Sequence, residues 1–155
     1  MRKIRAVTLA LLFTLALVVS QASTANAAKS GSINGVGSVV IDGVLYDFNF
    51  AGSQVNKGGY TILDHANPKT RSLTGKASCF RLVDDYTAVI SGPASYKNQK
   101  ILGGGSFVLI VAQESVDPTQ PDEIYIATSN EPFSCSADIS GYNLIPVTGS
   151  IDVTP

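Results

Sequence analysis

The clearest pattern in the chain is a strict alternation of apolar and polar side chains within residues 38–51. One face of this extended segment carries the apolar positions Val44, Tyr46, Phe48 and Phe50. The other face carries Asp47 and Asn49. A period of two predicts a half-buried β-strand. The preceding Asp42-Gly43 pair suits a type I′ turn, because both central residues of that turn need positive φ. The pattern therefore predicts a tight hairpin with its aromatic side chains in the core.

The rest of the chain repeats short apolar or alternating runs separated by Gly, Pro, Asn and Asp. Residues 107–112 are apolar at every position, which indicates a central strand covered on both faces. The other expected strands are residues 60–64, 73–83, 86–91, 123–128, 133–139 and 144–153. This spacing predicts an all-β domain of about eight or nine strands, built either as an antiparallel sandwich or as a closed barrel.

The N-terminus has the three-part pattern of a secretory signal peptide. Arg2, Lys3 and Arg5 precede an apolar run over residues 6–19, and Ala25-Asn26-Ala27 fits a signal peptidase site. A run of about 14 residues is short of the roughly 20 that span a bilayer. We expect a signal peptide at 1–27, a short linker at 28–32 and a single β domain at 33–155. The mature protein is then secreted to the periplasm or the medium, without a membrane anchor.

Removal of the signal peptide changes the charge balance. The chain has 11 basic and 12 acidic residues, and loss of Arg2, Lys3 and Arg5 leaves a net charge of −4. A mildly acidic domain without a basic cluster is a poor binder of nucleic acid.

Two cysteines, Cys79 and Cys135, remain in the mature chain. An even count in an exported protein favours a disulfide, with two separate buried thiols as the alternative. Alternation places Cys79 on the same side as Arg81, away from Phe80. A bridge therefore requires a bulge near Cys79, an edge position, or a strand covered on both faces.

Acidic side chains gather between residues 114 and 123, beside two prolines. Carboxylate oxygens are the ligands that calcium prefers, although the spacing matches no EF-hand. The cluster consists of Glu114, Asp117, Asp122 and Glu123. We take Asp117, Asp122 and Glu123 as candidate calcium ligands, and solvated surface acids as the alternative.

Few residues suggest catalysis. His65 is the single histidine and follows Asp64, but adjacent strand residues point to opposite faces, so a polar loop histidine is the better interpretation. Gly103-Gly104-Gly105 precedes a strand instead of a helix, which argues against a phosphate site.

Tyr96 and Tyr142 lie in polar stretches and are the tyrosines expected to be exposed, where they could stack on a glycan.

The order of these motifs resembles a known family. Gly35 and Gly37 open the domain, the aromatic strand follows, and Cys79 precedes Ala88-Val89-Ile90-Ser91-Gly92. Phe133-Ser134-Cys135 and Gly149-Ser150-Ile151-Asp152-Val153 close it. The chain is similar to the small secreted β-domains of the post-COAP type, and departs from them at Asp84-Asp85-Tyr86, where a Gly-Asn turn is usual. The resemblance implies a bacterial, exported β-module with no assigned activity.

The sequence thus predicts a secreted, non-catalytic β-module with a binding or structural role at the cell surface or in the medium. One alternative is a β-barrel carrier of a small apolar ligand, since eight or more strands can close around a cavity. The other is an enzyme with an unrecognised site. No cofactor other than calcium is expected.

Overall fold

The first hairpin forms as the alternation predicts. In the computed structural model, which describes residues 31–155, β1 (Ser32–Ile41) pairs antiparallel with β2 (Val44–Ser53). Asp42 and Gly43 form the turn with φ of 51° and 77°. Both values lie in the left-handed region that a type I′ turn requires, which explains the Asp-Gly pair. β1 therefore begins at the last residue of the expected linker, and the expected signal peptide lies outside the described residues.

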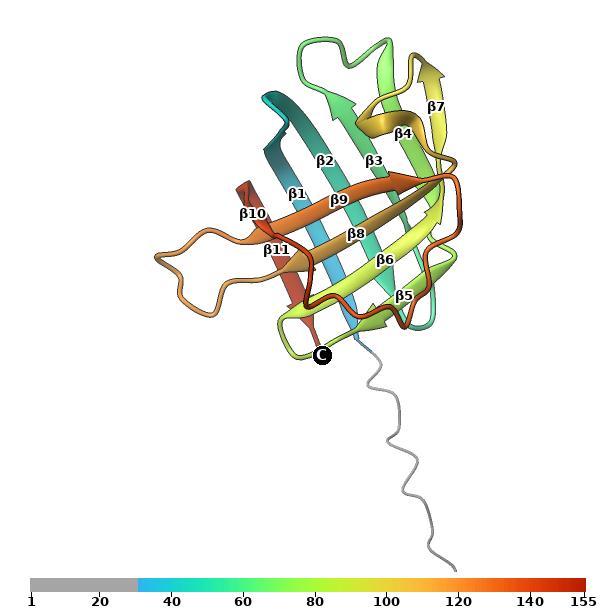
Figure 1. Cartoon of the computed structure of the whole chain (residues 1–155). Coiled ribbons are helices and arrows are strands. Elements are labelled where there is room, and N and C mark those ends of the chain that lie inside the picture. Colours follow the sequence, from blue (N-terminus) through green and yellow to red (C-terminus); the bar gives the residue numbers. More distant parts are fainter. Residues whose placement is uncertain (1–30) are drawn as a thin grey trace, which may run out of the picture.

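The strands form two antiparallel sheets that face one another (Figure 1). The six-stranded sheet has the order β11-β1-β2-β3-β4-β7, and its further members are β3 (Gly59–Asp64), β4 (Arg71–Lys76), β7 (Ser95–Asn98) and β11 (Thr148–Thr154). The five-stranded sheet has the order β10-β9-β8-β6-β5, with β5 (Cys79–Leu82), β6 (Thr87–Pro93), β8 (Phe107–Gln113), β9 (Glu123–Ser129) and β10 (Ile145–Pro146).

Neither sheet closes on itself. Of the two architectures that the sequence allowed, the closed barrel is therefore wrong. The described residues contain eleven strands, more than the eight or nine expected. Besides the short 3₁₀ turn η1 (Leu102–Gly104), they contain no helix, and none therefore that could span a membrane.

Two expected strands, residues 73–83 and 144–153, are each in fact two strands that belong to different sheets; the second divides into β10 and β11. β4 ends at Lys76, and the chain crosses to the opposite sheet before β5 begins at Cys79. The crossing is fixed by backbone hydrogen bonds from Ala77 N–H to Gly58 and from Ser78 N–H to Ser91. The apolar pattern persists through the crossing because Ala77 is itself buried between the sheets. Pattern alone therefore could not locate the break.

The aromatic face of β2 fills the space between the sheets, as predicted. Tyr46, Phe48 and Phe50 are at most 5 % exposed, and the rings of Phe48 and Phe50 stack at 5.6 Å. The opposite sheet contributes apolar side chains such as Ile90, Ile110 and Ile124. Burial of each such side chain contributes about 1.5–3 kcal/mol to folding.

β8 is covered on both faces, which confirms the interpretation of residues 107–112 as a central strand. Its outward-facing Leu109 and Val111 form a second apolar cluster with Val89 of β6. A segment that we call the strap, residues 130–144, packs on this cluster with its apolar side chains Phe133, Ile139, Tyr142 and Leu144. The expectation of a strand at residues 133–139 is wrong. These residues have no ladder partner, and their apolar side chains cover a sheet from outside.

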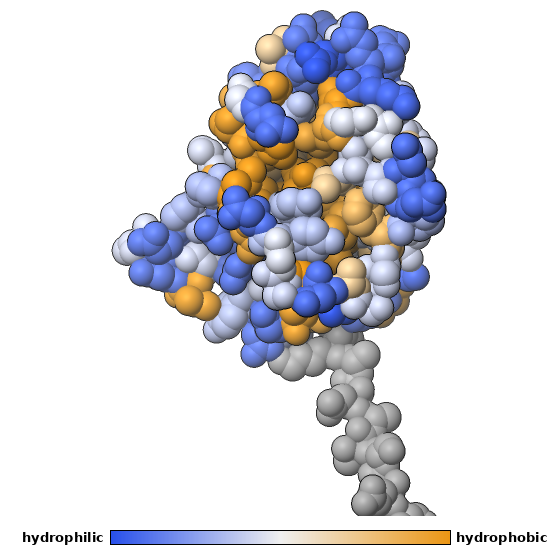
Figure 2. All heavy atoms as spheres, in the orientation of Figure 1, coloured by the Kyte–Doolittle hydropathy of each residue, from blue (hydrophilic) through white to orange (hydrophobic). Residues whose placement is uncertain are grey.

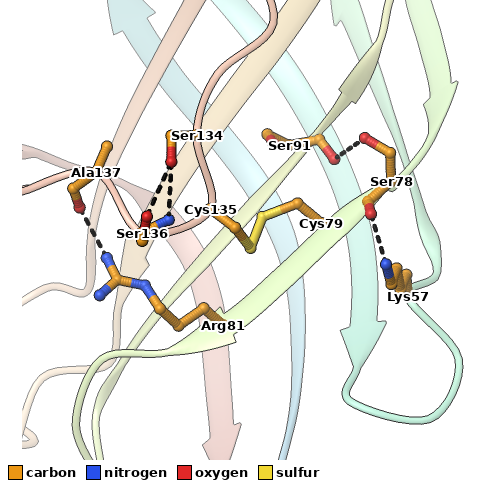
Figure 3. The surroundings of a disulfide bond; sticks show 9 residues. All are labelled: Lys57, Ser78, Cys79, Arg81, Ser91, Ser134, Cys135, Ser136 and Ala137. Atoms are coloured by element: carbon orange, nitrogen blue, oxygen red, sulfur yellow. Dashed lines mark hydrogen bonds between the residues drawn. A yellow bond between two sulfur atoms is a disulfide. The ribbon is translucent and has the colours of Figure 1, made fainter.

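The strap is attached to β5 by the predicted disulfide between Cys79 and Cys135, whose Cα atoms are 5.7 Å apart (Figure 3). The described residues contain no free cysteine, so the alternative of two thiols is wrong. Arg81 Nη2 donates a hydrogen bond of 2.9 Å to the Ala137 carbonyl beside the bridge. Cys79 can face away from the main core because β5 is an edge strand and the strap covers its outer side.

Tyr60 gives the fold a sensitivity to alkali. It is buried in the core, and its hydroxyl donates to the Pro93 carbonyl at 2.9 Å. Burial raises the pKa of the Tyr60 phenol far above its ordinary value of 10.0. The unfolded chain thus releases this proton near pH 10 while the folded chain retains it. The contribution of Tyr60 to the free energy of unfolding is therefore fully present below about pH 10. Above that pH it falls by up to about 1.4 kcal/mol per pH unit.

Urea unfolding between about pH 8 and about pH 11 measures this slope. Y60F is expected to lose about 1 kcal/mol at the lower pH, because the hydrogen bond to Pro93 is absent, and to show a shallower alkaline slope. A slope in Y60F equal to that of the wild type would contradict the assignment to Tyr60.

Candidate functional site

An open cleft of about 640 Å³ lies between the two sheets, at the end where the β1–β2 hairpin turns. Its apolar walls come from four elements and consist of Ile41, Val44, Tyr46, Ile101, Leu102 and Ile126. Figure 2 shows a hydrophobic hollow on this side of the molecule, between the turn of the hairpin and β9. Volumes of roughly 300–1,000 Å³ are usual for small-molecule sites. The cleft is therefore large enough for a small ligand.

One wall of the cleft is the η1 loop, whose backbone is unusual. Leu102 has φ of 52° and Gly103 has φ of 80°. A non-glycine residue in the left-handed region costs roughly 1 kcal/mol or more, so surrounding contacts must stabilise it. The Thr128 hydroxyl donates to the Leu102 carbonyl and accepts from Gly105 N–H, while Tyr96 Oη donates to the Gly105 carbonyl at 2.8 Å. These hydrogen bonds hold the η1 loop in this conformation.

Polar groups surround the cleft: Asp42, Arg71, Lys100 and Thr128. Arg71 Nη1 forms a 3.0 Å ion pair with Asp64 Oδ2, and the Asp64 side chain is only 3 % exposed. Asp64 also accepts the backbone N–H groups of Ala66 and Asn67. Arg71 Nε is buried and makes no hydrogen bond within the part of the chain that the structure describes. The cleft thus has a cationic side chain with a donor left unpaired.

His65 lies directly after β3, at the side of a smaller cleft of about 310 Å³ that also includes Val44 and Arg71. Its Nδ1 is 2.8 Å from Asp47 Oδ2, and both side chains are well exposed. Asp64, the neighbour in sequence, instead faces inward to Arg71. A His–Asp pair can orient an imidazole for proton transfer. Within residues 31–155, no serine, threonine or cysteine side chain forms a hydrogen bond with this pair.

The candidate calcium residues have other partners. Asp122 Oδ1 accepts Ser115 N–H at 2.8 Å, and its Oδ2 accepts Ile151 N–H at 2.7 Å. Glu114 Oε2 accepts Val153 N–H at 2.8 Å. Because β11 is the edge of its sheet, these two carboxylates satisfy edge N–H groups that have no neighbouring strand. We call this arrangement the edge latch; it consists of Glu114, Asp122 and the N–H groups of Ile151 and Val153.

Asp117 binds within its own loop, since its Oδ1 accepts the Thr119 N–H and hydroxyl at 2.9 and 2.7 Å. These two hydrogen bonds lower the pKa of the Asp117 carboxyl. Glu123 lies in β9, opposite Gln113. No group of three or more His, Cys, Asp or Glu side chains in residues 31–155 is arranged to hold a metal. The structure therefore does not bring Asp117, Asp122 and Glu123 together as a calcium site.

The two tyrosines expected at the surface are partly buried. Tyr96 turns inward to support the η1 loop through Gly105. Tyr142 belongs to the strap and stacks on Tyr125 with ring centroids 4.5 Å apart. The polar sequence around both residues predicted exposure. Their contact partners, Gly105 and Tyr125, are not neighbours in the sequence, so local pattern could not indicate these contacts. Tyr96 and Tyr142 therefore do not form the exposed pair that was expected.

The chain matches no family model, no curated protein and no solved structure. The resemblance to post-COAP domains stays a prediction, and the cleft is interpreted from its own residues.

Proposed function

We propose that the protein is a secreted, non-catalytic binding module that holds a small ligand in the cleft between its sheets. The observation that carries this proposal is the cleft itself, in which apolar side chains line an opening of about 640 Å³ beside a few polar groups. Sites of this composition are typical of small-molecule binding. The hydrogen bonds on Leu102 and Gly105 favour binding further, because a preorganised wall loses little entropy when a ligand enters.

The signal-peptide pattern and the disulfide support export, since disulfides persist in oxidising compartments. The hypothesis of a carrier is altered by the fold. We place the ligand in the open cleft between two sheets, and not inside a barrel. The periplasm and the medium remain the two proposed destinations.

Filling the cleft tests the proposal. In V44F a larger apolar side chain occupies the space that Val44 lines, and no hydrogen bond is removed. Binding of anilinonaphthalene sulfonate, followed by its fluorescence, is expected to weaken on the order of fivefold, which corresponds to about 1 kcal/mol. V40F is the matched control, because Val40 lies on the outer face of the same hairpin and is 56 % exposed. Equal weakening in both variants, or in neither, would contradict a site in the cleft.

Native mass spectrometry of the protein purified from its secreting host, with and without reductant and chelator, provides the broader test. The expected species begins at Ala28, contains one disulfide and retains a small molecule. A mass excess lost on chelation would instead indicate calcium at residues 114–123. A species that retains residues 1–27 would contradict cleavage and secretion.

A further inference from the structure

We propose that the cleft binds small amphipathic acids, each with an apolar aliphatic or aromatic body and a single carboxylate. This inference rests on the proposed function, and it adds the chemical class of the ligand. It is drawn from the placement of apolar and cationic side chains around the opening.

The apolar body is matched by the inner wall. Val44 and Tyr46 of β2 face Ile126 of β9 across the cleft, and Leu102 covers it from the η1 loop. Tyr46 and Ile126 are 5 % and 6 % exposed, so they form the floor of the cleft, while the half-buried Val44 and Leu102 offer more apolar surface to a ligand. Apolar surface that enters it gains about 25 cal/mol for each Å² removed from water.

The carboxylate is matched by Arg71. Its Nη1 is engaged by Asp64, but Nε has no acceptor, and a buried donor without a partner costs about 1–3 kcal/mol. A carboxylate next to Arg71 supplies an acceptor, with the reorientation of the guanidinium that bidentate pairing involves. The carboxylate of Asp64 remains satisfied meanwhile by the N–H groups of Ala66 and Asn67.

Lys100 adds a second positive charge. It lies beside the η1 loop, where its aliphatic part packs next to Gly104 and its side chain lines the cleft. The acids near the opening are Asp64, which is paired with Arg71, and Asp42, which is exposed at the hairpin turn. A cationic ligand would be repelled by Arg71 and Lys100, with only Asp42 of the lining residues to attract it. A neutral ligand could accept a hydrogen bond from Arg71, but only one that is not charge-assisted. A carboxylate offers a charged acceptor to Arg71 and lies in the field of Lys100 as well.

Ligand affinities can be measured by amide chemical shifts of the folded, oxidised protein during titration below the micellar range. Decanoate and naphthalene-1-acetate represent the aliphatic and aromatic acids, and decanol and decylamine are the neutral and cationic counterparts of decanoate. Both acids are expected to shift the amides of Val44 and Gly103. Decanoate should bind about tenfold more tightly than decanol, as expected for one charge-assisted hydrogen bond.

Two variants assign the preference to the named cations. K100Q is expected to reduce the ratio of decanoate to decanol affinity severalfold, whereas K97Q, an exposed lysine on β7, should leave it unchanged. D64N/R71Q should reduce the preference more than K100Q does, while decanol still binds. The double change avoids leaving Asp64 as an unpaired buried charge. If D64N/R71Q does not fold, as judged by circular dichroism, K100Q against K97Q decides the question alone.

The outcomes separate this inference from the proposed function. Equal affinities for decanoate and decanol, with shifts at the cleft, overturn the acid class and leave a binding cleft. Tighter binding of decylamine overturns the class in the same way. If none of the four compounds shifts the amides around the cleft, and V44F has no effect on probe binding, both proposals fail.

Discussion

Replacing Cys79 and Cys135 together by alanine is expected to lower the free energy of unfolding by about 4 kcal/mol. The bridge joins residues 56 positions apart, and in the chain-entropy model a loop of that length restricts the unfolded chain strongly. The strap loses its covalent attachment at the same time. Its remaining contacts with β5 and the second apolar cluster include the Arg81–Ala137 hydrogen bond.

Urea unfolding gives the change in stability, and near-ultraviolet circular dichroism reports the stacked pair Tyr125 and Tyr142. We expect a weaker tyrosine signal in the double variant before the far-ultraviolet signal of the sheets is lost. The control is S134A/S136A, which removes an exposed hydrogen bond of the strap and keeps the disulfide. A loss below about 1 kcal/mol in the cysteine variant would show that apolar packing alone holds the strap.

The change D122A is expected to lower the free energy of unfolding by about 3 kcal/mol or more. The Asp122 carboxylate accepts two backbone hydrogen bonds, from Ser115 and Ile151, and hydrogen bonds to charged groups contribute about 1.5–3 kcal/mol each. Loss of the carboxylate leaves the partly buried N–H of Ile151 without an acceptor. Of the two contacts in the edge latch, only the one between Glu114 and Val153 then remains.

Amide hydrogen exchange at Ile151, together with urea unfolding, measures this effect. Exchange at Ile151 should accelerate in D122A more than exchange in the β1–β2 hairpin. D152A provides the control, because Asp152 lies on the same strand but is exposed. Equal losses of stability in D122A and D152A would contradict the role of the latch.

Local pattern was sufficient where neighbouring residues determine the structure. The alternation of Tyr46, Phe48 and Phe50 and the Asp42-Gly43 turn specified the first hairpin, since strand faces and turn conformations depend on adjacent positions. The pairing of Cys79 with Cys135 was predicted from the expected export of the chain and from the even number of cysteines. Sequence could not choose between barrel and open sheets, because closure depends on which edge strands meet.

The residues that line the cleft were missed for the same physical reason. Val44, Arg71, Leu102 and Ile126 come from segments far apart in the sequence, and only the pairing of strands brings them to one end of the molecule. The nearest local signal was the glycine run after Leu102, which indicates an unusual backbone but not what it contacts. Asp122 was predicted as a calcium ligand from its carboxylate alone, because sequence does not show the N–H groups of Ser115 and Ile151 that donate to it.

The pairing of β1 with β11 also determines when the domain can become stable. Ser32 lies opposite Thr154, so the six-stranded sheet is complete only when both ends of the domain are present. Contacts between such distant residues make folding slow, typically milliseconds to seconds. In an exported chain, this topology delays the formation of a compact structure until translocation is nearly finished. The strand order that places the two ends of the domain side by side would thus also help to keep the precursor extended during the export that we propose.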